Sequence, residues 1–489
     1  MRFFRISILF CLFILLLGLT SFAAWTNYAP GIDYQEFSES SPVINEVFVT
    51  RMDRSVSTAI IDTCLGLDII PTGREIVSSM ATRKENDICF WGNEWGKYRY
   101  DVVAAINGSF FNTSNGAIIG GYIQSGSLDK RPEQYSTVWV PFVFKDDRSC
   151  FIAGSLTVPT SGNKIYYVHS GQSQSITNIN TSRSTDDLII YTPQYDSTTG
   201  TNEWGYEVLV ELTTPPGIVN SPDYITGIVR AKESYIGDMD IPFNHIVISA
   251  HGTAISTLSA GTQIGSEVRI TQQVTEASGK EMPGTYAYLR GYYSFLRNGV
   301  VYDADGVDSM LTARHPRTAI AYNSNYIFFV VCDGRSLISL GMSMEELGNF
   351  CKNRLGATEG LNLDGGGSST MWLDGTVKNN PSDGSERPVS NGIMMISLIE
   401  NNENSSEFGT GYQVSVDTSS YLRRGPGTSW TVLDTLTTGT IGTVRENSVN
   451  GVYADGHYWW NCVFGDQEGW IAESQLSLES VNVSLWMLY

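Results

Sequence analysis

Short runs of alternating or β-branched apolar residues recur along most of the chain. They lie at Val43–Val49, Thr58–Ile61, Val138–Phe144, Lys164–Val168, Glu207–Leu212, His245–Ser249, Glu267–Thr271 and Thr318–Ala321. Alternation sends successive side chains to opposite faces of an extended chain, so each run predicts a β-strand. We therefore expect an α+β fold whose main domain is rich in strands, with a mixed sheet and few helices.

Only one segment has a clear helical pattern. Ser343–Glu346 has the spacing of a capping box, and Gly356 is placed to end the helix that follows. Between them, apolar residues are spaced for one helical face at Leu347, Phe350, Cys351 and Leu355. The sequence thus predicts a helix between Ser343 and Gly356.

The residues around this helix predict a strand–helix–strand unit. Tyr326–Cys332, which forms a hairpin with Thr318–Tyr322, leads into Asp333-Gly334-Arg335, and Gly360–Leu363 leads into Asp364 and a glycine-rich turn. The crossover makes the two strands parallel, and parallel strands end at the same edge of a sheet. We expect Asp333 and Asp364 to face one cleft there, because open α/β sheets bind ligands at that edge.

Several groups near that edge are candidates for binding an oxyanion. The glycine-rich turn offers N–H and hydroxyl donors suited to a phosphate or sugar oxygen, at Gly365, Gly366, Gly367, Ser368 and Ser369. Guanidinium groups, which bind phosphate bidentately, are available at Arg314, Arg317 and Arg335. The plainer alternatives are that the Asp-Gly pairs only form turns and that one arginine serves a structural ion pair.

The first residues and the overall charge indicate where the protein works. A basic start, Met1–Arg5, precedes an apolar run from Ile6 to Leu19 and a small-x-small end at Ser21-Phe22-Ala23. We expect residues 1–23 to be a signal peptide of a secreted, periplasmic or cell-surface protein; an uncleaved anchor, which needs about 20 apolar residues, is the alternative. The net charge of −20 over 489 residues disfavours binding to nucleic acid.

Cysteine and histidine usage gives little support for a metal centre. Beyond residue 23 the cysteines are Cys64, Cys89, Cys150, Cys332, Cys351 and Cys462, of which Cys332 and Cys351 could pair in a disulfide or remain buried thiols. The five histidines are scattered, and no motif spaces ligands for zinc. We expect no required cofactor, although carboxylates could hold Ca²⁺ or Mg²⁺.

Six sequence blocks resemble the phosphodiester glycosidase family and follow its order. They are AAINGSFFNTSNGAIIGGYIQSGSL, VISAHGTA, RHPRTAIAY, VVCDGRS, LNLDGGGSSTMWLDG and NPSDGSERPVSNGIM. The resemblance covers about residues 45–400 and implies a phosphodiester glycosidase domain over residues 24–400. It also implies that Asn107 and His251 line the cleft and that Arg387 is among the residues that bind substrate or phosphate. The stretch Leu289–Leu296 departs from the glycine-rich pattern of many members, which affects the expected substrate.

The end of the chain resembles a second family. A polar linker is expected at 401–411, followed by a domain at 412–480 and a tail at 481–489. The segments YLRRGPGTSWTVLDTLTTGTIGTV and HYWWNCVFGDQEGWIAESQL resemble a bacterial SH3-like domain. This resemblance implies a small all-β barrel that binds a cell-wall or envelope polymer. The linker suggests that residues 412–480 fold alone and are dispensable for catalysis on small substrates.

The family resemblance implies hydrolysis of a sugar, with N-acetylglucosamine as one candidate, joined through its anomeric carbon to a phosphodiester. The phosphomonoester that leaves has a second pKa near ~6 and needs little proton help, so the site must chiefly hold phosphate and stabilise an oxocarbenium-like carbon. We expect Arg317 and Arg335 to hold the phosphate, with Asp364 as nucleophile or base. Asp333 is the alternative carboxylate or an orienting partner. A glycan phosphodiesterase, an exo-glycosidase and a non-catalytic envelope-binding protein remain alternatives.

Overall fold

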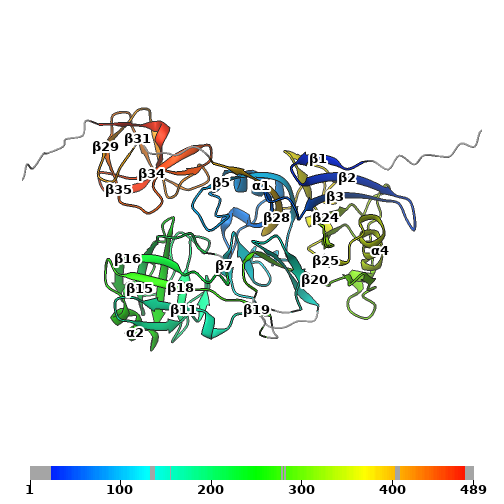
Figure 1. The fold of residues 1–489 in the computed structure, drawn as a ribbon, viewed down its shortest axis with the longest axis horizontal. Helices are drawn as coiled ribbons and strands as arrows, with labels where there is room; N and C mark the ends of the chain where they lie inside the picture. Colours follow the sequence, from blue (N-terminus) through cyan, green and yellow to red (C-terminus); the bar gives the residue numbers. More distant parts are fainter. Residues whose placement is uncertain are drawn as a thin grey trace, which may run out of the picture.

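The computed structural model describes residues 24–132, 138–154, 156–217, 219–276, 279, 282–401 and 408–479. The expected signal peptide at 1–23, the tail at 481–489 and most of the expected linker lie outside the described residues. The described chain is dominated by strands, which confirms the predicted α+β, strand-rich fold. Figure 1 shows α4 and α2 on opposite sides of the molecule, with the C-terminal strands packed beside the rest.

One eight-stranded sheet, here called the site sheet, has the order β1-β2-β3-β24-β23-β25-β21-β22. Its strands are β1 Thr26–Ala29, β2 Ile32–Glu39, β3 Asn45–Asp53, β24 Tyr326–Cys332, β23 Arg317–Tyr322, β25 Glu359–Asn362, β21 Leu296–Arg297 and β22 Val300–Val301. β24 and β25 are both antiparallel to β23, which lies between them. They therefore run in the same direction and end at the same edge, as the predicted crossover requires.

The predicted helix is α4, Met344–Leu355, and it connects β24 to β25. Its capping box is formed: the Ser343 hydroxyl accepts the N–H of Glu346, and the Glu346 carboxylate accepts the N–H of Ser343. Gly356 ends the helix in the left-handed conformation, with φ of 65°. The apolar face of α4 packs on one face of the site sheet, and the other face of that sheet joins the core of the central sheets.

Two five-stranded sheets form the centre of the main domain and share a core. Their strands are β27 Thr376–Val377, β26 Met371–Leu373, β5 Tyr98–Asn107, β28 Asn391–Glu400 and β4 Ala59–Leu65 in one, and β7 Ser127–Lys130, β6 Tyr122–Gln124, β20 Thr285–Tyr292, β8 Trp139–Lys145 and β9 Cys150–Ile152 in the other. Helix α1, Val77–Asn86, was not predicted, because no capping side chain marks its start. A buried ion pair of 2.8 Å between Lys84 and Asp62 fixes α1 against β4.

A second eight-stranded sheet, the distal sheet, has the order β12-β11-β18-β16-β15-β17-β14-β13. Its strands are β12 Gln172–Ser175, β11 Lys164–Tyr167, β18 Glu267–Thr271, β16 Ile225–Ser234, β15 Gly205–Leu212, β17 His245–His251, β14 Leu188–Tyr191 and β13 Asn178–Ile179, with β10 Leu156–Thr157 and β19 Thr275–Glu276 as a separate pair. β13 is parallel to β14, so this sheet is mixed. The remaining short elements are α2 Ala254–Gly261, α3 Ser309–Thr312, η1 Gly66–Asp68, η2 Thr160–Gly162, η3 Gly366–Ser368 and η4 Glu473–Gln475.

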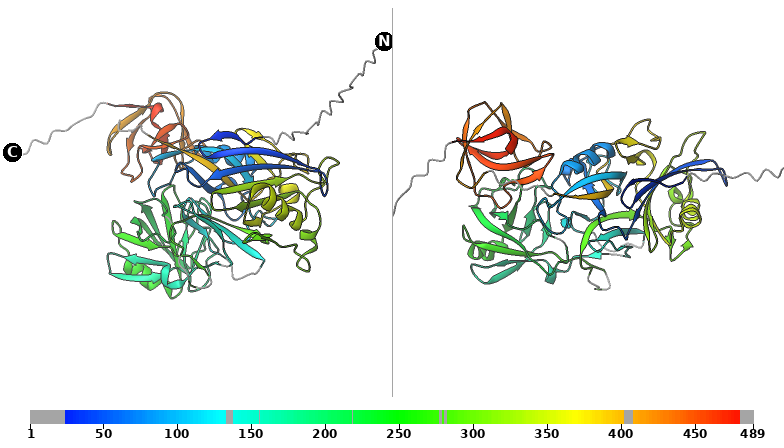
Figure 2. Two further views of the ribbon diagram at one scale, coloured as in Figure 1. Left: turned by 45° about the vertical axis from the view of Figure 1, so that its right-hand side comes forward. Right: turned by 45° about the horizontal axis from the view of Figure 1, so that its top comes forward.

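The last strands form a separate all-β unit, the C-terminal unit, over residues 413–478. They are β29 Gln413–Val416, β30 Ser420–Arg423, β31 Val432–Leu436, β32 Ile441–Val444, β33 Val452–Ala454, β34 His457–Phe464, β35 Gln467–Ala472 and β36 Leu476–Leu478. The unit has a core of its own around Val414, Leu422 and Ile471. The views in Figure 2 place it beside both the distal sheet and the central strands.

The C-terminal unit is docked on the main domain through apolar and polar contacts. The Phe243 ring lies 5.4 Å from the rings of both Trp430 and Trp470, edge to face. The N–H of Ser448 donates to Glu211 over 2.8 Å. Deletion of residues 412–480 would therefore expose the apolar surface around Phe243. The sequence pattern of a polar linker did not indicate this loss of packing.

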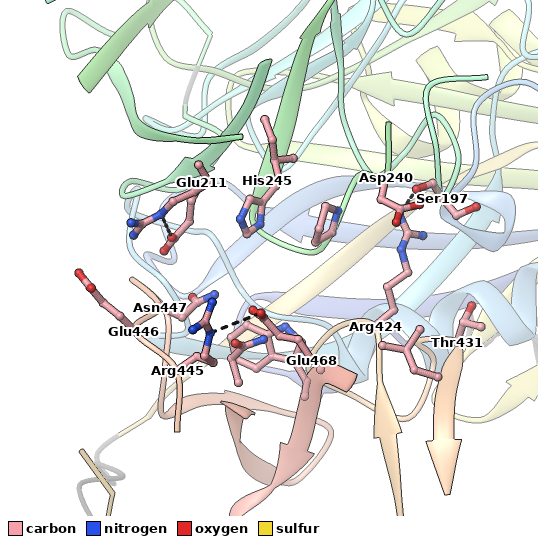
Figure 3. Close-up of a pocket in the computed structure, with 17 residues that line it drawn as sticks. Ser197, Glu211, Asp240, His245, Arg424, Thr431, Arg445, Glu446, Asn447 and Glu468 are labelled. Atoms are coloured by element: carbon pink, nitrogen blue, oxygen red, sulfur yellow. Dashed lines mark hydrogen bonds and ion pairs between the residues drawn. The ribbon is translucent and has the colours of Figure 1, made fainter. Parts of the chain in front are cut away.

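A pocket of about 720 Å³ lies beside this interface. Figure 3 shows Glu211 and His245 of the distal sheet on one side and Arg445, Asn447 and Glu468 of the C-terminal unit on the other. The pair Glu211–Arg230 and the pair Arg445–Glu468 balance charge within it, at 2.6 and 3.4 Å.

We predict that Phe243→Ala lowers the free energy of unfolding by ~3–5 kcal/mol, because it leaves a cavity between two packed units. Urea denaturation of the whole chain measures this loss. The matched control is Trp204→Ala, since Trp204 is 61% exposed and its removal should cost within ~0.5 kcal/mol. Equal effects of the two substitutions would show that the docking contributes nothing to stability.

Candidate active site

The edge at which β24 and β25 end brings four of the quoted sequence blocks together. Asp333 follows β24 directly, and Asp364 lies two residues beyond β25. β5 delivers Asn107 to the same place, and the segment that precedes β28 brings Arg387. Residues distant in sequence thus surround the turn at 364–369.

Asn107 is fully buried and ties three segments together. Its Nδ2 donates to the backbone carbonyl of Asp364 over 2.7 Å. Its Oδ1 accepts the Thr318 hydroxyl at 2.8 Å and the N–H of Thr370 at 3.2 Å. The buried Asn107 side chain therefore positions the turn at 364–369 from the protein interior. This differs from the expectation that Asn107 lines the cleft.

Backbone carbonyls accept three N–H groups of the glycine-rich turn: the Pro316 carbonyl, outside the turn, and those of Gly365 and Gly366 within it. The N–H groups of Gly366, Ser368 and Ser369 donate to carbonyls at 2.9–3.2 Å. The expectation that the whole turn cradles a phosphate is therefore corrected for these N–H groups. Glycine is needed here for close approach: a Cβ on Gly367 would collide with the Arg387 guanidinium, and one on Gly366 would lie 3.0 Å from that of Arg335.

Asp364 is half-buried beside this turn. Burial raises the pKa of its carboxyl to about 6, against the opposing effects of a hydrogen bond from Ser368, the charge of Arg387 and the N–H of Gly365. A carboxyl that titrates near 6 is ionised at neutral pH yet poorly solvated. Such a group is suited to act as a base or as a nucleophile.

Asp333 has a different environment, although it lies at the same edge. Its carboxylate accepts the Asn379 amide at 3.0 Å and the N–H of Asn380 at 3.0 and 3.1 Å. Asn379 also donates to the Ser369 carbonyl at 3.0 Å and accepts the N–H of Met371 at 2.7 Å. Burial raises the pKa of Asp333, and its hydrogen bonds hold the loop after Asn379 against the glycine-rich turn. An orienting role for Asp333, one of the two that the sequence left open, stays a prediction that these contacts fit.

Two guanidinium groups lie on the glycine-rich turn. Arg335 is exposed, has a left-handed backbone with φ of 62°, and reaches Ser382 over 3.4 Å. Arg387 is paired with Asp383 at 2.6 Å and reaches the Ser368 hydroxyl at 3.4 Å. The charge of Arg387 acts on the Asp364 carboxyl, and Arg335 lies on the same glycine-rich turn against Gly366.

The other two predicted arginines, Arg317 and Arg314, make contacts within the fold. Arg317 is buried and donates to the carbonyls of Met310, Ala313 and Met342 over 2.6–2.8 Å. Burial lowers the pKa of Arg317 to about 10. The expectation that it holds phosphate is corrected, because its donors are engaged by backbone oxygens. Arg314 instead pairs with Glu346 of α4 at 2.5 Å.

His251 is not brought to this edge. It ends β17 in the distal sheet, three residues before the start of α2, whereas α4 and the site sheet lie on the opposite side of the molecule (Figure 1). The expectation that His251 lines the cleft is therefore corrected: the block that contains it belongs to another sheet.

Sequence reasoning missed several contributors. Ser382 and Asp383 lie in the NPSDGSERP segment, and Asn379 directly precedes it; the serine, asparagine and aspartate content of this region is itself a loop signal. His315, in the RHPRT block, is half-buried; burial and the charges of Arg317 and Arg335 lower its pKa. A neutral imidazole therefore lies near Arg335.

The departing stretch borders the site. The Tyr292 carbonyl accepts a hydrogen bond from the side-chain amide of Asn362, the residue two positions before Asp364, at 3.1 Å. The Tyr292 ring lies 4.6 Å from the ring of Trp139. Phe110, which belongs to the same sequence block as Asn107, packs edge to face on Trp139 at 5.3 Å. Three aromatic rings, of which only Tyr292 belongs to the departing stretch, therefore pack together on this side.

Within the described parts of the chain, no three His, Cys, Asp or Glu side chains gather closely enough to hold a metal ion. All six described cysteines are buried free thiols, so Cys332 and Cys351 are not joined. No helix among the described residues has the length and apolar character needed to cross a membrane.

Comparison with known proteins identifies one matching family. Residues 229–396 match the family model NAGPA, described as phosphodiester glycosidase. That range includes Asp333, Asp364 and Arg387 but leaves out Asn107. The chain is also 39% identical over 80 residues to the SPbeta prophage-derived uncharacterized protein YomE of Bacillus subtilis (strain 168), a match that covers 16% of this chain and 12% of that protein.

Two solved structures are similar to the chain at low sequence identity. A hypothetical protein from Synechocystis is 20% identical with a TM-score of 0.50, over 76% of this chain and 63% of that one. The catalytic domain of zebrafish N-acetylglucosamine-1-phosphodiester alpha-N-acetylglucosaminidase, auto-inhibited by its pro-peptide, is 13% identical with a TM-score of 0.36, over 76% of this chain and 85% of that one. The chain thus spans just under two thirds of the Synechocystis protein and about an eighth of YomE.

We predict that Asp364→Asn stabilises the protein at pH 8. Folding raises the pKa of Asp364 from 3.8 to about 6, so the ionised carboxylate costs folding free energy above pH 6. That cost falls as the pH drops from 6 towards 4, because the native carboxyl takes up a proton. Thermal unfolding should therefore show a higher Tm for the variant at pH 8 and a smaller difference at pH 4.5. A variant that is less stable at pH 8 than at pH 4.5, relative to the wild type, would contradict the assignment.

Proposed function

We propose that the protein is a secreted hydrolase that cleaves a sugar, with N-acetylglucosamine as one candidate, from a sugar-1-phosphodiester. The observation that carries this proposal is the half-buried Asp364 beside a glycine-rich turn on which Arg335 and Arg387 lie. The family match over residues 229–396 supports the reaction class. Cleavage of a phosphodiester glycoside needs both kinds of group at one place.

The two arginines would bind the phosphodiester oxygens. Arg335 is better placed to bind the phosphodiester, because it is exposed and its hydrogen bond to Ser382 is long, at 3.4 Å. Arg387 already forms an ion pair with Asp383. The charge-assisted contacts strengthen as the C1–O bond breaks and negative charge grows on the departing phosphate. A general acid is not essential, since a phosphomonoester is a good leaving group.

Asp364 would act at the anomeric carbon. As a base it takes a proton from the attacking water, and as a nucleophile it forms the bond to C1 that water later replaces; in both cases the sugar gains a hydroxyl and the phosphomonoester leaves with the bonding electrons. Asp333 would hold the 379–387 loop, and so Arg387, in register with the turn. Asn107 would fix the Asp364 backbone.

The location and the polymer partner belong to the same proposal. The N-terminal pattern of a basic start, an apolar run and a small-x-small end supports export to the periplasm or cell surface. The resemblance of the C-terminal unit to SH3-like domains supports recruitment to an envelope polymer that carries the substrate.

We predict that Asp364→Asn mainly lowers kcat, whereas Arg335→Ala mainly raises KM. Asp364→Asn should lower kcat by ~10²–10⁴-fold with little change in KM, because it removes the carboxylate and keeps its shape. Arg335→Ala should raise KM for sugar-1-phosphodiesters several-fold to a few hundredfold, from the ~1.5–3 kcal/mol of a charged hydrogen bond. Steady-state kinetics on a panel of sugar-1-phosphodiesters, with sugar and phosphomonoester both quantified, measures both effects.

The matched control is Asp374→Asn. Asp374 occupies the Asp-Gly turn between β26 and β27, with φ of 45°, and is remote from the catalytic edge, so activity should be unchanged. An active Asp364→Asn enzyme together with a dead Asp333→Asn enzyme would move the catalytic carboxylate to β24 and overturn the assignment.

A further inference from the structure

An exposed apolar turn lies directly beside Arg335. Leu337 is 95% exposed, Ile338 is 62% exposed and Leu340 is 42% exposed, and Ile44, whose carbonyl accepts the N–H of Leu340 at 3.1 Å, is 42% exposed. These four residues are here called the apolar tip. Single exposed apolar residues are common on protein surfaces, but a contiguous group beside a candidate active site indicates an interaction surface.

The apolar tip is held rigidly by the structure beneath it. The N–H of Ser336 donates to the Ser339 carbonyl over 3.0 Å, and the N–H of Ser339 donates to the Ser336 hydroxyl over 3.1 Å. The buried Ser339 hydroxyl donates to the Asp333 carbonyl over 2.7 Å. The Asn45 side chain accepts the N–H of Gly341 at 2.7 Å. Leu337 and Ile338 are therefore displayed by a braced turn rather than left out by a loose one.

The shape of the tip decides between possible occupants. An apolar groove would enclose a single hydrocarbon chain, but a side chain that is 95% exposed projects outward and lines no groove. Projecting aliphatic side chains enter a soft apolar phase instead, which for an exported protein means the boundary between headgroups and acyl chains of a bilayer. The net charge of −20 favours a zwitterionic surface over an anionic one.

The distance along the chain sets the depth of the site. Leu337 lies two residues after Arg335, so their Cα atoms are at most ~7 Å apart. Apolar side chains of interfacial proteins enter ~5–10 Å into the headgroup and acyl boundary. With Leu337 at that depth, the Arg335 guanidinium lies at the level of the headgroup phosphates, together with the glycine-rich turn against which it packs.

We propose that the apolar tip docks the protein on the surface of a lipid bilayer and presents the candidate active site to phosphodiesters at headgroup level. The docking is argued from the geometry of the tip, and the choice of a bilayer as its occupant also uses the export that the proposed function includes. Its consequence, that the substrate class is a sugar phosphodiester carried on a lipid, rests on the proposed function.

The test uses protein that begins at Ala24, which contains every described element and lacks the apolar run at 6–19. Its binding to phosphatidylcholine vesicles is measured by flotation, for the wild type and for the Leu337→Ser/Ile338→Ser double variant. The double variant should bind at least ~10-fold more weakly, the effect of losing about 1.4 kcal/mol of apolar transfer. The matched control is Ile236→Ser/Ile264→Ser, which alters two residues that are each 64% exposed and belong to the distal part of the chain.

A second measurement reports insertion at the tip itself. Because the six described native cysteines are buried, a Leu337→Cys variant can be labelled selectively with an environment-sensitive dye. Its emission should shift to the blue when vesicles are added, whereas the same dye on Ile236→Cys should not respond.

Three results would overturn the proposal: no binding of the wild type to vesicles, equal binding of the double variant, or a dimer in sedimentation that the double variant abolishes. The last result would make a second copy of the chain the occupant. These readouts need no turnover, so they fail or succeed independently of the proposed function. If docking is found and no sugar phosphodiester is hydrolysed, only the substrate claim falls.

Discussion

The candidate active site depends on the hydrogen bonds of one buried amide, Asn107. Its position at the end of β5 lets it hold the Asp364 carbonyl, the Thr318 hydroxyl of β23 and the N–H of Thr370 at once. The interior leaves such a group no water to bond to, so it has to find partners in the protein, and its partners become fixed in turn. The central and site sheets are thereby locked at the point where β25 delivers its aspartate.

Asp333 and Asp364 lie at the same sheet edge but have different environments. Asp333 accepts hydrogen bonds from Asn379 and Asn380 and so controls the loop that carries Arg387, whereas Asp364 stays half-buried with a raised pKa beside the turn. The same loop of β24 that ends in Asp333 and Arg335 continues into the apolar tip. The groups that we propose for phosphate binding, for carboxylate chemistry and for surface contact are therefore adjoining parts of one sheet edge.

The sequence was informative wherever local signals and function coincide. The capping box at Ser343 and the Asp-Gly turns mark elements by short-range chemistry, and the strand directions that bring Asp333 and Asp364 to one edge follow from a single crossover. Sequence-based prediction failed for residues whose contact partners are distant in the sequence. Nothing near Arg317 reveals that backbone carbonyls of α3 and Met342 consume its donors, and nothing near His251 reveals that β17 lies in another sheet. The docking of Phe243 on Trp470 is equally long-range.

The central claim is that water replaces phosphate at the anomeric carbon of a sugar-1-phosphodiester, with the carboxylate of Asp364 acting on that carbon. Hydrolysis in water enriched in ¹⁸O, followed by mass analysis of both products, tests it most directly. If the account is right, the label appears in the anomeric hydroxyl of the released sugar and the phosphomonoester remains unlabelled. Label in the phosphate would mean that the P–O bond is cleaved, as in a glycan phosphodiesterase, and would contradict the account.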